Sequence, residues 1–123
     1  MRLGRKITGG KYHARRKTRL HERPRQERIV VLGETKTKQI RTRGGHIKTV
    51  LLKCNIANVI VNNKAQKAKI TNVIETPSNK FFARQNRLVK GAIIDTSLGK
   101  AKITNRPSQE AQVNAVLIEP KKE

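Results

Sequence analysis

The sequence is nearly devoid of aromatic side chains. Its 123 residues include one tyrosine and two phenylalanines, namely Tyr12, Phe81 and Phe82, and no tryptophan. A core must therefore be built from Val, Ile, Leu and Ala, and we expect the phenylalanine pair to lie within it. Proteins that read single-stranded nucleic acid stack bases on several exposed aromatic side chains, so the sequence disfavours that class.

Cysteine and acidic residues are also scarce. Cys54 is the only cysteine, which excludes an intrachain disulfide and a cysteine-cluster zinc site, and we expect it to be a buried strand thiol. The 8 acidic residues are scattered, and His13 and His21 lie among cations that disfavour a bound metal. Neither Gly9-Gly10 nor Gly44-Gly45 is followed by the Lys-Ser/Thr of a phosphate-binding loop. The sequence therefore predicts no enzyme, no cofactor and no metal site.

Long apolar runs are missing as well. No stretch approaches the roughly 20 apolar residues of a membrane-spanning helix, and no basic segment carries an apolar helical face. The start of the chain has positive charge without an apolar run behind it, so we expect no secretory signal. What the chain has in abundance is positive charge, because 29 Lys and Arg residues against 8 Asp and Glu residues give +21. That charge opposes compaction unless a polyanion neutralises it, which predicts a nucleic acid partner and neither a membrane nor a small-molecule substrate.

The charge is concentrated at the N-terminus. Residues 1–28 hold eleven basic residues and two acidic ones, and the basic positions follow no single helical face. We interpret residues 1–28 as a basic arm that is disordered when free and orders between RNA helices. A tail that serves only solubility is the alternative. Gly9 and Gly10 permit a sharp turn or a close approach to phosphates, and Tyr12 offers a flat face to a base or ribose. The candidate RNA ligands here are Arg5, Lys6, Gly9, Gly10, Lys11, Tyr12, Arg15, Arg16, Lys17 and Arg19.

From Ile29 onward the signals are those of β-strands. Short β-branched or alternating runs are separated by turn residues such as Gly33, Gly44-Gly45 and Asn62-Asn63. Eight or so such strands with little helix predict a mainly β fold, specifically a small closed or nearly closed β-barrel with a basic, irregular N-terminal extension. An open sheet of this size would leave exposed edges. We assign residues 29–120 to the barrel and residues 121–123 to a charged C-terminal tail. The expected strands lie in "RIVVLGE", "TKTKQIRTRGG", "HIKTVLLKC", "ANVIV", "QKAKITNVIE", "GAIIDT", "KAKITN" and "QVNAVLIE".

Some local features of this region leave alternatives open. In "KAKITNVI" we expect Ala68, Ile70 and Ile74 to share the buried face of a strand. The hexapeptide "KAKITN" occurs at 67–72 and again at 100–105, through either a shared half-buried requirement or an ancient duplication. The duplication requires both copies to be the second strand of a hairpin. Residues 78–89 form either a short helical turn capped by Ser78 or another strand.

A second basic cluster surrounds the glycine pair at 44–45. On a strand, Arg41 and Arg43 emerge on one face, and Gly44-Gly45 let backbone amides approach a phosphate, with His46 and Lys48 beyond the turn. An ordinary solvated hairpin is the alternative. Because aromatic residues are few, we expect the partner to be structured RNA held through phosphates and shape with little base readout. A looser third set consists of Arg84, Arg87, Lys90 and Arg106.

The basic arm also carries a resemblance. "RKITGGKYHARRKTRLHE" resembles the signature of the S-eight-e family of small-subunit ribosomal proteins, in which a basic residue and Thr-Gly-Gly precede a basic cluster that runs into Glu. "RTRGGHIK", "VKGAIIDTSLGKAKITNRP" and "VNAVLIE" are similar too, so the resemblance covers nearly the whole chain. Without the long insertions of eukaryotic members, the chain looks like an archaeal one. It departs from the family pattern at Glu22-Arg23-Pro24 and at 108–111, where many members have two glycines.

The resemblance implies a structural constituent of the cytoplasmic small ribosomal subunit. It implies a β-barrel with a basic extension that binds small-subunit ribosomal RNA beside neighbouring ribosomal proteins and supports subunit assembly and translation. A non-ribosomal nucleic-acid-binding barrel, such as a chromatin-like DNA coat or an RNA chaperone, is the alternative. The family's functional positions carry over to Thr8, Gly9 and Gly10, to the Arg15–Arg19 cluster, to Arg43, Gly44 and Gly45, and to Arg106-Pro107.

Overall fold

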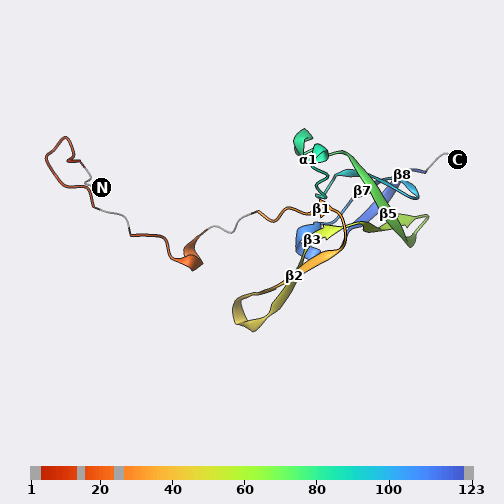
Figure 1. Cartoon of the computed structure of the whole chain (residues 1–123), viewed down its shortest axis with the longest axis horizontal. Coiled ribbons are helices and arrows are strands. Elements are labelled where there is room, and N and C mark those ends of the chain that lie inside the picture. The colour runs from red at the N-terminus through yellow and green to blue at the C-terminus, as the bar shows by residue number, and fades with distance from the viewer. Residues whose placement is uncertain (1–3, 14–15, 24–26, 121–123) are drawn as a thin grey trace.

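The structure is a computed structural model that describes residues 4–13, 16–23 and 27–120, and most of its ordered elements are strands (Figure 1). Each of the predicted strand runs overlaps one of these strands. The strands are β1 (Val31–Leu32), β2 (Lys36–Arg41), β3 (Ile47–Cys54), β4 (Ile56–Val61), β5 (Lys64–Glu75), β6 (Ile93–Thr96), β7 (Gly99–Ile103) and β8 (Asn114–Pro120). The helices are α1 (Lys80–Arg84) and α2 (Pro107–Glu110), and the 3-10 turns are η1 (Leu20–Glu22) and η2 (Arg43–Gly45).

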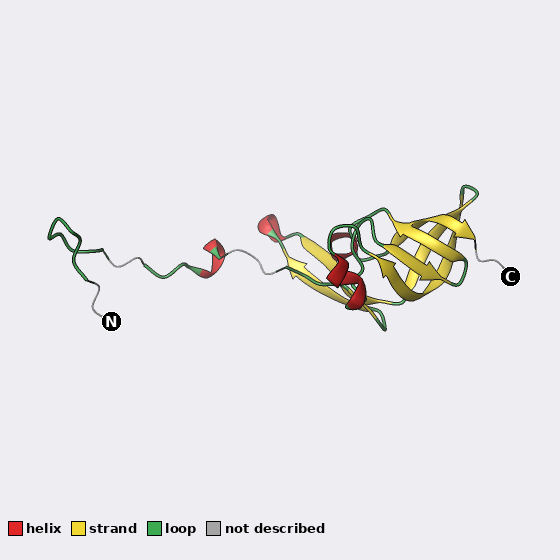
Figure 2. Cartoon of the chain, turned by 90° about the horizontal axis from the view of Figure 1, so that it is seen from above, coloured by secondary structure: helices red, strands yellow, loops and turns green. Residues whose placement is uncertain are grey.

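Five of the strands close into a barrel in the order β4-β5-β6-β7-β8 (Figure 2). Successive strands pair antiparallel, and a parallel pairing of β4 with β8 closes the ring. The predicted mainly β fold with a small barrel is therefore confirmed. The first three strands do not join the ring but form a separate sheet in the order β1-β3-β2.

The three-stranded sheet is attached to the barrel through β3. Its β2–β3 hairpin reaches away from the body, so the hairpin tip and the barrel lie at opposite ends of the folded part (Figure 2). At the inner end of β3, Leu51 and Cys54 enter the same apolar cluster as the barrel residues Ala57 and Val59. One core therefore supports both sheets, and it fixes the base of the hairpin.

The core is aliphatic, as the composition predicted. Its largest fully buried side chains include Leu51, Leu88, Ile94 and Ile103. Cys54 is buried, and its thiol donates a hydrogen bond to the carbonyl of Ile56 at 3.0 Å, which confirms the predicted strand thiol.

The predicted place of the phenylalanine pair is wrong. Phe81 is 66% exposed and Phe82 is only half-buried. Both belong to α1, so residues 80–84 are helical and not a strand, and Asn79 caps this helix instead of Ser78. The side-chain oxygen of Asn79 accepts a hydrogen bond from the Phe81 amide at 2.9 Å, which satisfies one of the free donors at the helix start.

The predicted buried face of β5 is wrong at the C-terminal end of the strand. Ala68 and Ile70 are buried as expected, but Ile74 is 45% exposed and Val73 takes its place in the core. The register between β5 and β6 shifts between Ile70 and Asn72. Such a bulge adds a residue to one strand and moves the side chains after it to the opposite face, here as far as a second shift between Val73 and Glu75.

The two "KAKITN" segments occupy equivalent positions. The first lies in β5, the second strand of the β4–β5 hairpin, and the other lies largely in β7, the second strand of the β6–β7 hairpin. Ala68 and Ile70 are buried in one copy, as Ala101 and Ile103 are in the other. The duplication interpretation therefore meets its structural requirement, and a shared burial requirement explains the same pattern.

Candidate nucleic-acid interface

The basic hairpin, defined as β2, η2 and β3 up to Lys48, presents its cations on an exposed two-stranded ribbon. Ile40 pairs with Lys48 and Arg41 with Ile47, so Arg41 and Lys48 flank the turn from opposite strands. Arg43 does not lie on the strand as predicted, because β2 ends at Arg41 and Arg43 opens η2. The side chains of the candidate ligands Arg41, Arg43, His46 and Lys48 are exposed, as are Gly44 and Gly45.

The turn of the basic hairpin depends on its glycines. Gly44 and Gly45 have φ angles of 76° and 81°, a left-handed conformation that other residues adopt only with strain. A Cβ atom on Gly44 would also lie 3.3 Å from Cδ2 of His46. Thr42 closes the loop, because its amide donates to the His46 carbonyl at 2.7 Å and its hydroxyl donates to the same oxygen at 2.9 Å. The result is a closed loop that holds Arg43 at its outer edge.

The basic hairpin is braced by α2 at Lys48. This short helix packs against β3, and Nζ of Lys48 donates to Oε1 of Gln109 at 2.5 Å. Arg106 precedes α2, and its backbone amide donates to Oε1 of Glu110 at 3.3 Å. Hydrogen bonds from the Asn105 side chain and the Arg106 amide hold the pKa of Glu110 below its ordinary value, and Lys90 contributes from farther away. Lys90 and Arg106 of the third set therefore both act on Glu110 of α2.

The cations of the hairpin are not neutralised within the protein. In the part of the chain that the structure describes, ion pairs join Arg16 and His21 to Glu22, and Lys100 to Glu119. None of these involves the hairpin. Its positive charge therefore faces solvent and is free to meet an anion.

A hollow of about 780 Å³ lies between η1 and the hairpin. His21 and Arg23 line one side of it, and Arg41 and Arg43 line the other. Neither His21 nor Arg23 was among the RNA ligands predicted from the sequence. No local signal indicates this arrangement, because the hollow is lined by residues about twenty positions apart in the chain.

Residues 4–13 form a small loop around the Thr-Gly-Gly motif. Arg5 and Lys11 make an isolated antiparallel bridge, and Lys6 both donates to the Gly10 carbonyl and accepts from the Gly9 amide, each at 2.9 Å. Gly9 has φ of 79°, so it serves the sharp turn, which exposes Thr8 beside it. Nζ of Lys6 lies 5.8 Å from the ring centre of Tyr12, which leaves that ring 52% exposed.

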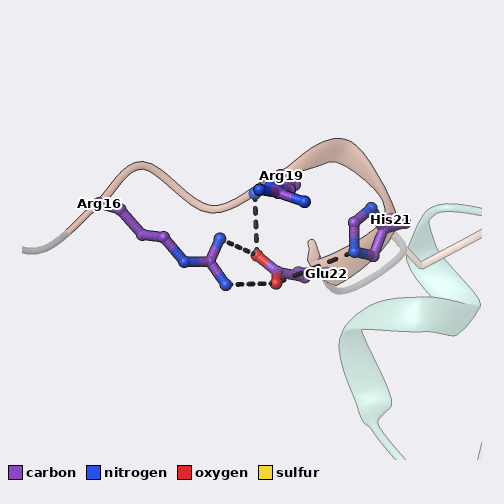
Figure 3. A network of polar contacts seen from close by, with 4 residues as sticks. All are labelled: Arg16, Arg19, His21 and Glu22. Carbon is purple, nitrogen blue, oxygen red and sulfur yellow. Dashed lines mark hydrogen bonds and ion pairs between the residues drawn. The ribbon is translucent and has the colours of Figure 1, made fainter.

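Residues 16–23 use their only acidic side chain to hold a turn (Figure 3). Both oxygens of Glu22 accept hydrogen bonds from Arg16, at 2.6 and 2.9 Å, and Oε2 also accepts from the Arg19 amide at 3.0 Å. The hydrogen bond from the Arg16 guanidinium, followed by that from the Arg19 amide, lowers the pKa of the Glu22 carboxyl. The hydrogen bond to Glu22 in turn raises the pKa of Arg16. Arg16 is therefore occupied within the chain, whereas Lys17 and Arg19 keep exposed side chains. Arg15 lies outside the described residues.

The remaining two candidates, Arg84 and Arg87, lie apart from the hairpin cluster. Cζ of Arg84 is 5.9 Å from the ring centre of Phe81, and Cζ of Arg87 is 4.5 Å from that of Phe82. The structure thus divides the third set into a pair near α2 and a pair on the aromatic rings of α1.

Neither a metal-binding cluster nor a membrane-spanning helix occurs in the described ranges. No cluster of three or more His, Cys, Asp or Glu side chains suited to a metal ion occurs there. The helices of the described segments are too short and too polar to cross a membrane.

Fold and surface together define a class, that of small basic β-barrel proteins with a cationic hairpin and a basic N-terminal segment. Comparison with known families is more specific, since the family model described as "Ribosomal protein S8e" matches residues 1–118. The chain belongs to the ribosomal protein S8e family.

Curated relatives are similar in sequence to this chain along almost their entire length. The chain is 46% identical over 117 residues to the "Small ribosomal subunit protein eS8" of Methanocorpusculum labreanum, covering 94% of both chains. It is 44% identical over 119 residues to the protein of that name from Halorubrum lacusprofundi, covering 96% of both. The Nanoarchaeum equitans protein of that name is 45% identical over 120 residues, covering 96% of this chain and 94% of its own. The resemblance to an archaeal member of the family is therefore confirmed.

Proposed function

We propose that this protein is a non-catalytic structural constituent of the small ribosomal subunit in the cytoplasm, where it binds structured ribosomal RNA. The basic arm and the basic hairpin supply the RNA contacts, and the barrel is the rigid body from which both extend. Binding contributes to subunit assembly and so to translation, and neighbouring ribosomal proteins complete the surroundings. The names of the curated relatives, all small ribosomal subunit proteins, support this proposal.

The observation that carries the proposal is the unneutralised charge at the hairpin tip. Arg41 and Arg43 face His21 and Arg23 across one hollow, with no carboxylate among its lining residues. The three guanidinium groups of Arg23, Arg41 and Arg43 around this hollow repel one another, and an anion among them would relieve that repulsion. An RNA phosphate fits because guanidinium groups bind its oxygens with paired, charge-assisted hydrogen bonds.

This mode of binding recognises the path of the RNA backbone more than the RNA sequence. Contacts to phosphates position a protein on nucleic acid, whereas contacts to base edges specify the sequence. Most of the proposed ligands of the arm and hairpin are exposed cations and glycines. The interface is therefore suited to a folded RNA whose phosphates have a fixed arrangement.

Neutralising the hairpin tip tests the proposal. The double variant Arg41→Gln, Arg43→Gln is compared with a matched control, Lys67→Gln, Lys69→Gln, which removes two exposed charges from the barrel strand β5. The probe is a transcript of small-subunit ribosomal RNA, titrated at several salt concentrations. Each lost phosphate contact should reduce the slope of log affinity against log salt by about 0.7–0.9. The hairpin variant should thus lose about 1.5 from its slope and the barrel variant much less.

Two results would contradict the proposal. One is an equal loss of affinity and slope in the hairpin and barrel variants. The other is competition by duplex DNA as effective as competition by the ribosomal transcript, which would favour a chromatin-like coat. Sedimentation supplies an independent check, because the proposed protein should remain with small subunits in high-salt gradients.

A further inference from the structure

Phe81 keeps most of its ring in water. Complete burial of a phenylalanine side chain is worth about 1.5–3 kcal/mol relative to exposure, and the core of this chain is otherwise filled by aliphatic residues. Phe81 is nevertheless 66% exposed, although the chain has only two phenylalanines. Its ring is available to a partner, and the arm and hairpin contacts do not use it.

The local fold holds this ring outward. α1 follows β5 and packs against it, and Figure 1 shows the helix at the edge of the body. Ala83 packs against the core and Phe82 is half-buried, so these two residues define the inner side of the helix. Phe81 and Arg84 lie three positions apart and are both exposed, so they share the outer side. The Asn79 cap fixes the helix start at the Phe81 amide.

Two guanidinium groups accompany the rings. Cζ of Arg84 lies 5.9 Å from the ring centre of Phe81, within the range of a cation–π contact. Arg87 lies closer, with Cζ 4.5 Å from the ring centre of Phe82, and its backbone is anchored by a hydrogen bond to the Phe82 carbonyl and a bridge to Val31. No ion pair of the described segments involves Arg84 or Arg87. The site therefore combines an exposed aromatic ring with two cations that have no ion pair in the described segments.

These features suit a nucleotide. A base has a flat π face that stacks on an aromatic ring, and the phosphates next to it accept hydrogen bonds from guanidinium groups. A protein partner that covered the ring would also bury Arg84 beside it, which is costly without a matching carboxylate. We propose that Phe81 is a stacking platform for one unpaired base of the bound RNA, with Arg84 and Arg87 holding the adjoining phosphates. This inference rests on the proposed function and adds a contact of a different kind.

The platform gives affinity without selecting a base. Stacking tolerates every base because each has a π face, so recognition remains a matter of RNA shape. The RNA must, however, present an unpaired nucleotide opposite α1. From the sequence we expected little base readout and a core position for Phe81. The exposed ring contradicts the core position, whereas a stacking contact that tolerates every base agrees with little base readout.

Stacking and phosphate contacts differ in their dependence on salt, and this difference provides the test. Phe81→Leu keeps an apolar helix-forming residue and removes only the flat ring. Its affinity for the small-subunit ribosomal RNA transcript should fall about tenfold with the salt slope unchanged, and Phe81→Tyr should restore it. Arg84→Gln should instead reduce the slope by about 0.7. Ile118→Ala, which trims an exposed apolar side chain on the barrel strand β8, is the matched control and should bind normally.

A spectroscopic readout locates the contact. The chain contains only two phenylalanines, so fluorine-labelled phenylalanine gives two signals, and the Phe81→Leu variant assigns them. The Phe81 signal should shift when the transcript is added, and it should remain in place when the protein is mixed with inorganic polyphosphate, which has charge but no bases.

The outcomes distinguish failure of the Phe81 platform from failure of the proposed RNA-binding function. Normal binding by Phe81→Leu, a change in its salt slope, or no rescue by Phe81→Tyr would overturn the platform while leaving the RNA-binding role intact. A Phe81→Leu protein that binds the transcript normally but fails to enter small subunits would also overturn it, in favour of a protein partner. Failure of the wild-type chain to bind the transcript would instead overturn the proposed function itself.

Discussion

Ala111 adopts a left-handed backbone conformation with φ of 60° and ψ of 12°. This conformation is costly for any residue with a Cβ atom, by about 1–2 kcal/mol. Ala111 ends α2, and its amide donates to the Pro107 carbonyl at 3.2 Å. Because α2 carries Gln109, which accepts a hydrogen bond from Lys48, the strained residue supports the basic hairpin at Lys48. At this position the chain keeps a conformation suited to glycine without having glycine.

Replacing Ala111 by glycine should therefore stabilise the protein. We expect Ala111→Gly to raise the free energy of unfolding by about 0.5–1 kcal/mol, because relief of strain exceeds the added flexibility of the unfolded chain. Urea denaturation followed by circular dichroism measures the change. Ala65→Gly, at an exposed position within β5, is the matched control and should destabilise, since glycine weakens a strand interior. Loss of stability in both variants would show that Ala111 is not strained.

Single residues also mark the limit of what the sequence could predict. The positions of Arg41 at a strand end and of Gly44 and Gly45 in a turn were predictable because strand alternation and turn chemistry are local. The exposure of Phe81 was not, because it depends on which side of α1 faces the body. Val73 replaced Ile74 in the core because a bulge in the pairing with β6 changes the face of the strand. A bulge is a property of two strands and leaves no signal in one of them.

At the scale of elements, strands were predictable and their partners were not. Alternating apolar residues and turn residues located all eight strands, since both signals lie within a few positions. The parallel pairs β1–β3 and β4–β8 join segments distant in the sequence. These pairings decide that five strands close the barrel and three form a separate sheet. For the same reason, the approach of His21 and Arg23 to the hairpin could not be anticipated.

The turns within the N-terminal arm are weak elements. The Arg16–Glu22 pair is exposed to solvent, where an ion pair typically contributes little because water and salt screen it. The loop around Gly9 has two backbone hydrogen bonds and no buried side chain to support it. A short two-stranded loop is at best marginally stable in water without packing. We therefore keep the proposal that the arm is disordered until it meets RNA.

Backbone relaxation measurements test the proposed behaviour of the arm. In the free protein, amides of residues 5–13 and 16–23 should have order parameters below about 0.6, against about 0.85 in the barrel strands. Addition of the ribosomal transcript should raise the arm values toward those of the barrel. An arm as rigid as β4–β8 without RNA would show that it is a preformed element and contradict its coupled ordering.

For the whole molecule, the distribution of charge matters more than its amount. The net charge is +21, and cations also line the outer faces of the barrel strands β5 and β7. A purely electrostatic coat would use all of them about equally. The proposed function instead assigns phosphate binding to the arm and hairpin, at the end of the molecule away from the barrel. Neutralising four exposed cations in the arm, or four in the barrel, distinguishes these possibilities, because both variants have the same net charge.

The decisive measurement is the salt dependence of binding to the small-subunit ribosomal RNA transcript. One variant changes Arg5, Lys6, Lys17 and Arg19 of the arm to glutamine, and the other changes Lys64, Lys67, Lys69 and Lys102 of the barrel. With about 0.7 lost from the slope per phosphate contact, the arm variant should lose nearly 3 and the barrel variant less than about 1. Equal slopes for the two variants would contradict the claim that this protein holds its RNA by the arm.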